Sequence, residues 1–388
     1  MPISISMRSY PLEIDDPPLT TSQGIANADQ PAWTVTSLET NSPAVPLAPL
    51  SSTCDAPRPL EGIKVLELCR IIAGPTIGRI LADYGADVLK VTGPGLSDVP
   101  FFQVDGNMGK HATEIDLKSP KGRCTFQKLL KEADVILDGY RPGALEKLGY
   151  GPASIARLGE RRGKGFVYVN ENCFGYTGEW ADRPGWQQIA DCVCYNLGLR
   201  NLTRSYADNM QVSGVAWAQG EFMNLNEPVV PPFPISDYGT GCIGAIAALT
   251  GLYHRATKGG SWHGKVSLLH YDLLLFKVGQ YPEPIKQQLR AQCSEEFLAR
   301  RHNHSVDDIS GTALSMMRKN YPELFNSKNT KTWYSKGYDA DICVVKPVLR
   351  ISGLEIGFQR GSRPNGYDEP SWDFSDDGDF VKSSRIKV

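Results

Sequence analysis

Strand and helix periods alternate along most of the chain. Residues 63–68 alternate between apolar and polar positions as in a strand, residues 76–84 have a helical period, and residues 88–91 form a second apolar strand. Pro75 suits the first position of that helix. A strand, a helix and a strand within about 30 residues predict a βαβ unit with parallel strands and a right-handed crossover.

The same alternation continues downstream. It predicts a helix over 121–132 and further strands over 135–137 and 166–169. We therefore predict an α/β fold with a doubly wound, Rossmann-like parallel sheet in a large domain. Residues 240–255 predict an apolar helix whose Gly and Ala residues suit close packing. The weaker patterns that follow are a short strand over 265–269, polar helices within 280–330 and a late strand over 341–345.

The first 57 residues differ from the rest. They contain nine prolines mixed with Ser and Thr, and no period lasts more than a few residues. This composition predicts a disordered or loosely draped arm over 1–57.

Composition narrows the class of protein. The chain has 388 residues, 41 basic and 43 acidic, with a formal net charge of -2. This balance argues against binding nucleic acid through bulk positive charge. No apolar run reaches the roughly 18 residues of a membrane-spanning helix, and the start does not resemble a secretory signal.

Cysteine usage predicts an intracellular, cytoplasmic protein. The nine cysteines are odd in number and irregularly spaced, which is typical of reduced thiols. The tight pair Cys192 and Cys194 has no further ligand at metal-binding spacing, so we predict no metal site. Residues 384–386 are similar to a peroxisomal tripeptide, but two residues follow them. A peroxisomal location stays open without a clear signal.

Motifs in a fixed order provide the strongest signal. The first turn, 69–75, has one glycine instead of the three of a dinucleotide fingerprint, which disfavours NAD or FAD. The order of segments resembles the class III CoA-transferases, a family that includes carnitine and formyl-CoA transferases and α-methylacyl-CoA racemases. The resemblance covers about 59–275. The segments that carry it are 59–68, 73–75, 81–91, 116–123, 140–149, 174–178, 182–185 and 237–241.

The resemblance implies a domain plan and an interlocked homodimer. It implies a CoA-binding α/β domain over 58–205, a linker with the catalytic helix over 206–275, and a shortened second domain with a C-terminal return over 276–388. No cofactor is bound permanently, because coenzyme A is substrate and product. The expected partners are an acyl-CoA and a carboxylic acid.

Asp237 stands at the position of the family's catalytic carboxylate. By its sequence context alone, an Asp before a glycine-led helix is an N-cap. The resemblance instead implies a nucleophile that attacks an acyl-CoA thioester, forms a mixed anhydride and releases CoA thiolate. The helix N-terminus would keep the carboxylate ionised and offer amides to a developing oxyanion.

The sequence departs from the family at the neighbouring pair. Trp186 replaces the racemase His, and Gln187 replaces the acid. Racemisation needs two acid–base groups, and neither side chain titrates. Two-base racemisation would then require Asp191 or another group. Gln187 can still orient an anhydride or donate a hydrogen bond to a carbonyl, so we assign it a catalytic role beside Asp237.

The resemblance also carries over CoA contacts. Apolar positions after the first strand would line the pantetheine and adenine approach, and basic residues would meet the phosphates or ribose. The assigned positions are Ile71, Ile72, Ala73, Lys90, Lys118, Arg141 and Lys147.

Three functions remain open. The first is transfer of CoA between acyl-CoA thioesters and carboxylic acids, the second is racemisation or epimerisation with another base, and the third is a non-catalytic CoA-binding homologue. Residues 344–348 and 361–366 are similar to fungal members of the family, which suggests secondary metabolism or toxin assembly as the setting.

Overall fold

A parallel sheet with one antiparallel edge strand forms the centre of the protein. The computed structural model describes residues 22–47, 57–96, 99–191 and 214–375. Within these residues the strand order is β1-β7-β6-β5-β2-β3-β4, and β1 alone runs antiparallel to its neighbour. The strands are β1 (Trp33–Ser37), β2 (Lys64–Leu68), β3 (Asp87–Thr92), β4 (His111–Glu114), β5 (Val135–Asp138), β6 (Val167–Asn172) and β7 (Trp262–Ser267).

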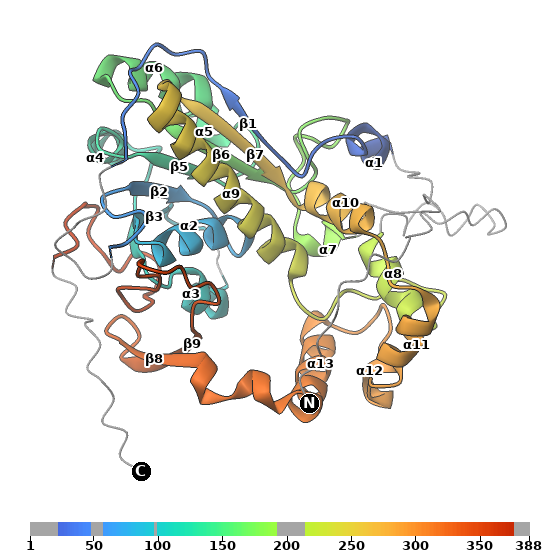
Figure 1. Ribbon diagram of the computed structural model, residues 1–388. Coiled ribbons are helices and arrows are strands. Elements are labelled where there is room, and N and C mark those ends of the chain that lie inside the picture. Colours follow the sequence, from blue (N-terminus) through green and yellow to red (C-terminus); the bar gives the residue numbers. More distant parts are fainter. Residues whose placement is uncertain (1–21, 48–56, 97–98, 192–213, 376–388) are drawn as a thin grey trace.

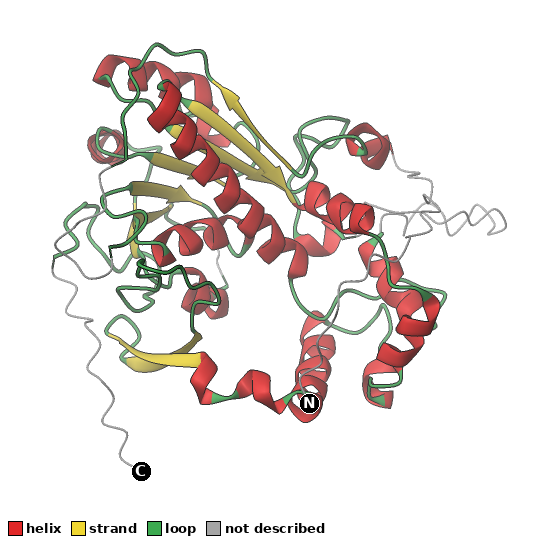
Figure 2. Ribbon diagram, viewed as in Figure 1, coloured by secondary structure: helices red, strands yellow, loops and turns green. Residues whose placement is uncertain are grey.

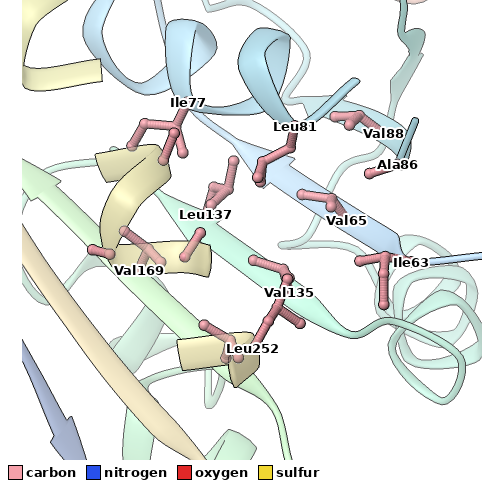
Figure 3. Packing of buried hydrophobic residues seen from close by; sticks show 14 of the residues in the cluster. Ile63, Val65, Ile77, Leu81, Ala86, Val88, Val135, Leu137, Val169 and Leu252 are labelled. Atoms are coloured by element: carbon pink, nitrogen blue, oxygen red, sulfur yellow. The ribbon is translucent and has the colours of Figure 1, made fainter. Parts of the chain in front are cut away.

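Helices cover both faces of this sheet, as the red and yellow elements of Figure 2 show. Helices α2 (Ala73–Asp83) and α9 (Ile235–Lys258) pack on one face, and α4 (Pro120–Leu130) and α6 (Pro152–Arg162) pack on the other. Strand positions alternate between these two cores. Figure 3 shows the first core, where Ile77 and Leu81 of α2 meet Val65, Val135 and Leu137. The predicted doubly wound α/β fold is confirmed.

The N-terminal prediction is wrong for residues 22–37. Residues Ser22–Asn27 form helix α1, and β1 pairs with β7 along five residues. Backbone hydrogen bonds to the sheet edge order this strand, so no long hydrophobic period is needed. Buried Gln23 also donates hydrogen bonds to the carbonyls of Phe174 and Thr177, which anchors α1.

Two smaller assignments also change. The sequence pattern did not predict β4, because His-Ala-Thr-Glu has no apolar alternation. The predicted strand over 265–269 ends at Ser267, whose hydroxyl accepts a hydrogen bond from the His270 amide at 3.1 Å. Ser267 therefore caps helix α10 (Leu268–Val278).

The C-terminal part adds short elements below the large sheet (Figure 1). Helix α13 (Val306–Asn320) and the hairpin of β8 (Thr330–Ser335) and β9 (Ala340–Val345) lie there. Trp372 returns to the large sheet, where it donates a hydrogen bond to the Leu129 carbonyl of α4. The predicted domain boundary at 205 lies outside the described residues. The remaining elements are α3 (Pro100–Gly106), α5 (Ala144–Lys147), α7 (Gln187–Ala190), α8 (Val215–Phe222), α11 (Glu283–Arg290) and α12 (Glu295–Leu298), with 3-10 turns Pro322–Phe325 and Ser327–Asn329.

Glycines let α9 approach α2 and the sheet closely, as its composition predicted. A Cβ at Gly251 would stand 2.5 Å from Val167 Cγ1, and one at Gly244 would stand 2.4 Å from Ile77 Cδ1. Among the described helices, none is long and apolar enough to cross a bilayer, α9 included.

Gly251→Val is expected to lower the free energy of unfolding by about 1–3 kcal/mol, because the stiff side chain of Val167 cannot yield. Urea unfolding followed by circular dichroism measures this change. Thr257→Val, on the exposed side of the same helix, is the control and should cost less than about 0.5 kcal/mol. Equal midpoints for the two variants would contradict the close packing.

Candidate active site

A large cavity opens at the carboxyl edge of the sheet. Strand β2 pairs with both β3 and β5, and the chain winds outward in opposite directions from these two neighbours. Open α/β sheets bind ligands at such a switch point. The cavity there measures about 1770 Å³, above the roughly 300–1,000 Å³ of pockets for drug-sized ligands. It can therefore hold a ligand as large as a nucleotide cofactor.

Asp237 lines this cavity from the first turn of α9. The N-cap of the helix is Pro234, so the expectation of an N-cap aspartate is wrong by three positions. The side chain is partly buried. Burial, and secondarily the charge of Asp191, raise the pKa of Asp237 to about 7. A carboxylate with this pKa is more basic than an ordinary one and ionises near neutral pH.

Gln187 holds the backbone of Asp237. Its Oε1 accepts a hydrogen bond from the Asp237 amide at 3.4 Å, and its Nε2 donates to Asp191 Oδ2 at 3.0 Å. The Ser236 hydroxyl contacts the other Asp191 oxygen at 2.7 Å. The buried Asp191 thus determines which end of the Gln187 amide faces α9. The structure therefore brings Gln187 and Asp237 together, and Gln187 positions the backbone of Asp237.

Trp186 presents an aromatic wall beside them. It lines the cavity with 49% of its surface exposed, and the Arg70 guanidinium lies 5.9 Å from its ring centre. Asp191, which the sequence offered as a substitute base, is fully buried and is not among the cavity-lining residues. The indole and Asp191 therefore do not supply a second base to the cavity.

Five of the seven predicted CoA contacts lie at the cavity. Ile71, Ile72 and Ala73 line it where β2 leads into α2, and the exposed Lys118 and Arg141 line it after β4 and β5. The two remaining lysines lie elsewhere.

Lys90 and Lys147 are not cavity-lining residues. Lys90 is buried, and its Nζ donates to Asn107 Oδ1 at 3.1 Å. The Lys90 ammonium group is thus bonded within the protein interior and does not face the cavity. Lys147 is exposed on α5. The structure lends these two positions no support as phosphate ligands.

Glu171 is a cavity residue that the sequence analysis missed. It lies near the end of β6 on the side of Val167 and Val169, which faces α2 and α9. A polar residue at the carboxyl end of a buried parallel strand was the available signal. Burial and then the charges of Asp237 and Asp138 raise the pKa of Glu171 to about 8.

Helix α13 closes the cavity from the C-terminal part. Val306, Asp307, Ser310 and Leu314 line it on this side. These residues lie about 70 positions beyond Asp237 in the chain, so no local pattern linked them to the site. In the described part of the chain, no group of three or more His, Cys, Asp or Glu residues is arranged to hold a metal ion.

Arg141→Ala and Lys118→Ala are each expected to raise the Kd for coenzyme A about tenfold, because each removes a cation from the cavity lining that the family resemblance assigns to the CoA phosphates. Titration calorimetry with coenzyme A at two salt concentrations measures the effect, which should shrink at high salt. Lys147→Ala is the matched control and should leave Kd unchanged. An equal loss in all three variants would contradict the placement of the phosphates.

Comparison with known proteins agrees with this geometry. CoA-transferase family III matches residues 60–292, so the chain belongs to this family. It is 36% identical over 320 residues to the acetyl-coenzyme A transferase nodX of Hypoxylon pulicicidum, covering 81% of this chain and 50% of that protein. It is 33% identical to an acyl-CoA transferase of Gibberella moniliformis, covering 82% of this chain and 53% of that protein.

The chain therefore spans about half the length of the curated relatives that it matches. Among solved structures, Rv3272 of Mycobacterium tuberculosis in its orthorhombic form has a similar fold. The TM-score is 0.54 at 20% identity, covering 80% of this chain and 98% of that one. At this identity the likeness concerns the fold alone.

Proposed function

We propose that the protein transfers coenzyme A between acyl-CoA thioesters and carboxylic acids. The observation that carries this proposal is Asp237, which lines a nucleotide-sized cavity with its backbone amide held by Gln187. The names of the fungal relatives, an acetyl-coenzyme A transferase and an acyl-CoA transferase, support the same reaction class.

The chemistry follows from the position of Asp237. Its carboxylate oxygen attacks the thioester carbonyl carbon, the carbon–sulfur bond breaks, and a mixed anhydride forms while the CoA sulfur leaves. The raised pKa of Asp237, about 7, makes it a better nucleophile than an ordinary Asp. An acceptor carboxylate then completes the exchange in a second step. Arg141 and Lys118 would hold the CoA phosphates, with Ile71, Ile72 and Ala73 along the pantetheine approach.

Chemical trapping tests this function directly. The protein is incubated with a panel of acyl-CoAs and hydroxylamine, and peptides are searched by mass spectrometry for a hydroxamate at Asp237. A hydroxamate that depends on the acyl-CoA supports transfer. Bound coenzyme A without any adduct, across the panel, would instead indicate the non-catalytic homologue.

Racemisation stays a second candidate because Glu171 and Asp237 both line the cavity. Two carboxyl groups can act as the acid and the base that exchange the proton on the carbon next to the thioester carbonyl. Deuterium incorporation at that carbon in D₂O, without an aspartyl adduct, would favour this reaction. Trp186 and Gln187, which stand where the racemases of the family carry His and an acid, argue for transfer.

We also propose an interlocked homodimer, as the family resemblance implies. The similarity of residues 344–348 and 361–366 to fungal members of the family suggests secondary metabolism or toxin assembly as the setting. The irregular cysteine usage suggests a cytoplasmic location. Sedimentation of the purified chain, with and without coenzyme A, tests the dimer.

A further inference from the structure

The cavity contains an acidic group that the transfer chemistry has not used. Glu171 reaches from β6 toward the gap between the end of β5 and the start of α2. A Cβ at Gly139 would stand 3.0 Å from Glu171 Oε2, and one at Gly74 would stand 3.7 Å from it. The glycine at 139 therefore leaves room for the carboxyl group, whereas a Cβ at Gly74 would make only ordinary contact with it.

The described part of the chain supplies no partner for this carboxyl group. Among the described residues, no hydrogen bond or ion pair holds Glu171, and part of its surface stays open toward the cavity. The nearby Asp138 differs, because it accepts hydrogen bonds from Tyr168 at 2.8 Å and from Asn170 at 2.9 Å and is not a cavity-lining residue. A buried carboxylate with a purely structural role normally accepts hydrogen bonds from the protein, as Asp138 does. Glu171 accepts none from the described residues, so its carboxyl group is available to a ligand in the cavity.

The two cavity carboxyl groups repel each other when both are ionised. Of the nearby charges, that of Asp237 disfavours the ionised form of Glu171 most strongly. Carboxyl groups that share a desolvated site hold one proton between them near neutral pH. Burial and the charge of an ionised Asp237 raise the pKa of Glu171 to about 8, so an ionised Asp237 favours a protonated Glu171.

We propose that Glu171 is the acid–base group for the CoA sulfur, an inference that rests on the proposed CoA transfer. As Asp237 attacks and the carbon–sulfur bond breaks, the Glu171 O–H donates its proton to the departing sulfur. The products are the aspartyl anhydride, neutral CoA thiol and Glu171 carboxylate. In the reverse direction Glu171 takes the thiol proton and regenerates the thiolate nucleophile.

The charge balance favours this assignment. Before the step, the one negative charge of the pair is on Asp237, and after it the charge is on Glu171, so this pair never carries two negative charges. Without this proton, the departing thiolate would develop in a cavity that Asp237 and Glu171 both line. Thiols have pKa values near 8.5, close to that of Glu171, and proton transfer is most efficient between matched groups.

The surrounding groups do not compete for this proton. Asp138 on β5 and Asp237 on α9 are the charged groups that act on Glu171, and burial raises the pKa of Asp138 to about 6. The other titratable groups near Glu171 have raised pKa values because of burial and remain neutral: Cys69, Cys173 and Tyr176.

The pH dependence follows with a definite sign. Acylation needs Asp237 ionised, which requires a pH above about 7, and Glu171 protonated, which requires a pH below about 8. The rate should therefore rise and then fall through these values, as the two apparent pKa values of one coupled pair. Single-turnover release of CoA thiol measures this rate.

Glu171→Gln is expected to slow acylation about 10²-fold and to abolish the alkaline fall, because an amide neither donates to sulfur efficiently nor titrates. The wild-type solvent deuterium isotope effect on thiol release should disappear as well. Glu171→Asp should keep the alkaline limb at a reduced rate. Asp138→Asn is the matched control. Its acylation rate should still fall at alkaline pH, but the fall should occur at lower pH, because a negative charge near Glu171 is removed.

These outcomes separate the two proposals. An aspartyl hydroxamate in the wild type, with an unchanged rate and pH profile in Glu171→Gln, overturns the role of Glu171 alone. No hydroxamate in the wild type overturns CoA transfer and this inference with it. Deuterium exchange next to the carbonyl that is lost in Glu171→Gln, with thiol release unaffected, would make Glu171 a carbon base and also overturn the inference.

Discussion

Asp237→Asn is expected to lower kcat for CoA transfer by about 10³-fold or more, because the nucleophile that forms the anhydride is removed. Coenzyme A should still bind with a Kd near the wild-type value, since the cations and apolar walls of the cavity are untouched. Stopped-flow measurement of thiol release and titration calorimetry test these two quantities separately. Asp237→Ala serves as a second variant, because Asn can deamidate back to Asp.

Asp307→Asn is the matched control for this experiment. Asp307 also lines the cavity, but it lies on α13 rather than at the start of α9. Its loss should change kcat far less than loss of Asp237. If Asp237→Ala retained a tenth or more of the wild-type rate, another group would be the nucleophile and the assignment would be wrong.

Lys110→Met is expected to lower the free energy of unfolding by about 3–5 kcal/mol. Lys110 Nζ pairs with Glu67 Oε2 at 2.5 Å, and both side chains are fully buried. It also donates to the Pro75 carbonyl at 2.7 Å in the first turn of α2. Burial lowers the pKa of Lys110 to about 8. Removing the lysine leaves the Glu67 carboxylate buried without a charge partner, which is the main cost.

The double variant Lys110→Met with Glu67→Gln is the control for this cost. Most of the lost stability should return, because the second change removes the unpaired charge. Guanidinium unfolding midpoints, compared at equal m-values, measure the recovery. A double variant that is no more stable than Lys110→Met would show that the lost stability comes from the hydrogen bond to the Pro75 carbonyl and not from the unpaired charge of Glu67.

The elements differ in how far their own residues determine them. The strand and helix periods between residues 63 and 169 predicted β2, α2, β3, α4, β5 and β6. Each of these elements buries apolar residues that recur with the period of its own secondary structure, so the pattern is visible in the local sequence. Strands β1 and β4 were missed, since both depend on pairing with a sheet edge. The pattern over 1–57 says nothing about β7, which β1 joins from more than 200 residues away.

The site divides in the same way. The ordered motifs identified Asp237, Gln187, Lys118 and Arg141, which all lie at the cavity. The same motifs could not exclude Lys90 as a CoA contact, although its ammonium group donates a hydrogen bond to Asn107 inside the fold. Whether a lysine meets solvent, ligand or a buried amide depends on packing between distant segments.

The sequence by itself determined the α/β class, the family and Asp237 as the proposed nucleophile, because these depend on local periods and on motifs in order. Only the tertiary structure decided that Glu171 shares a cavity with Asp237. The two carboxyl groups come from β6 and α9, 66 positions apart, and burial together with like charge sets their pKa values. Burial and proximity of that kind arise when the elements pack, so no local pattern could predict them.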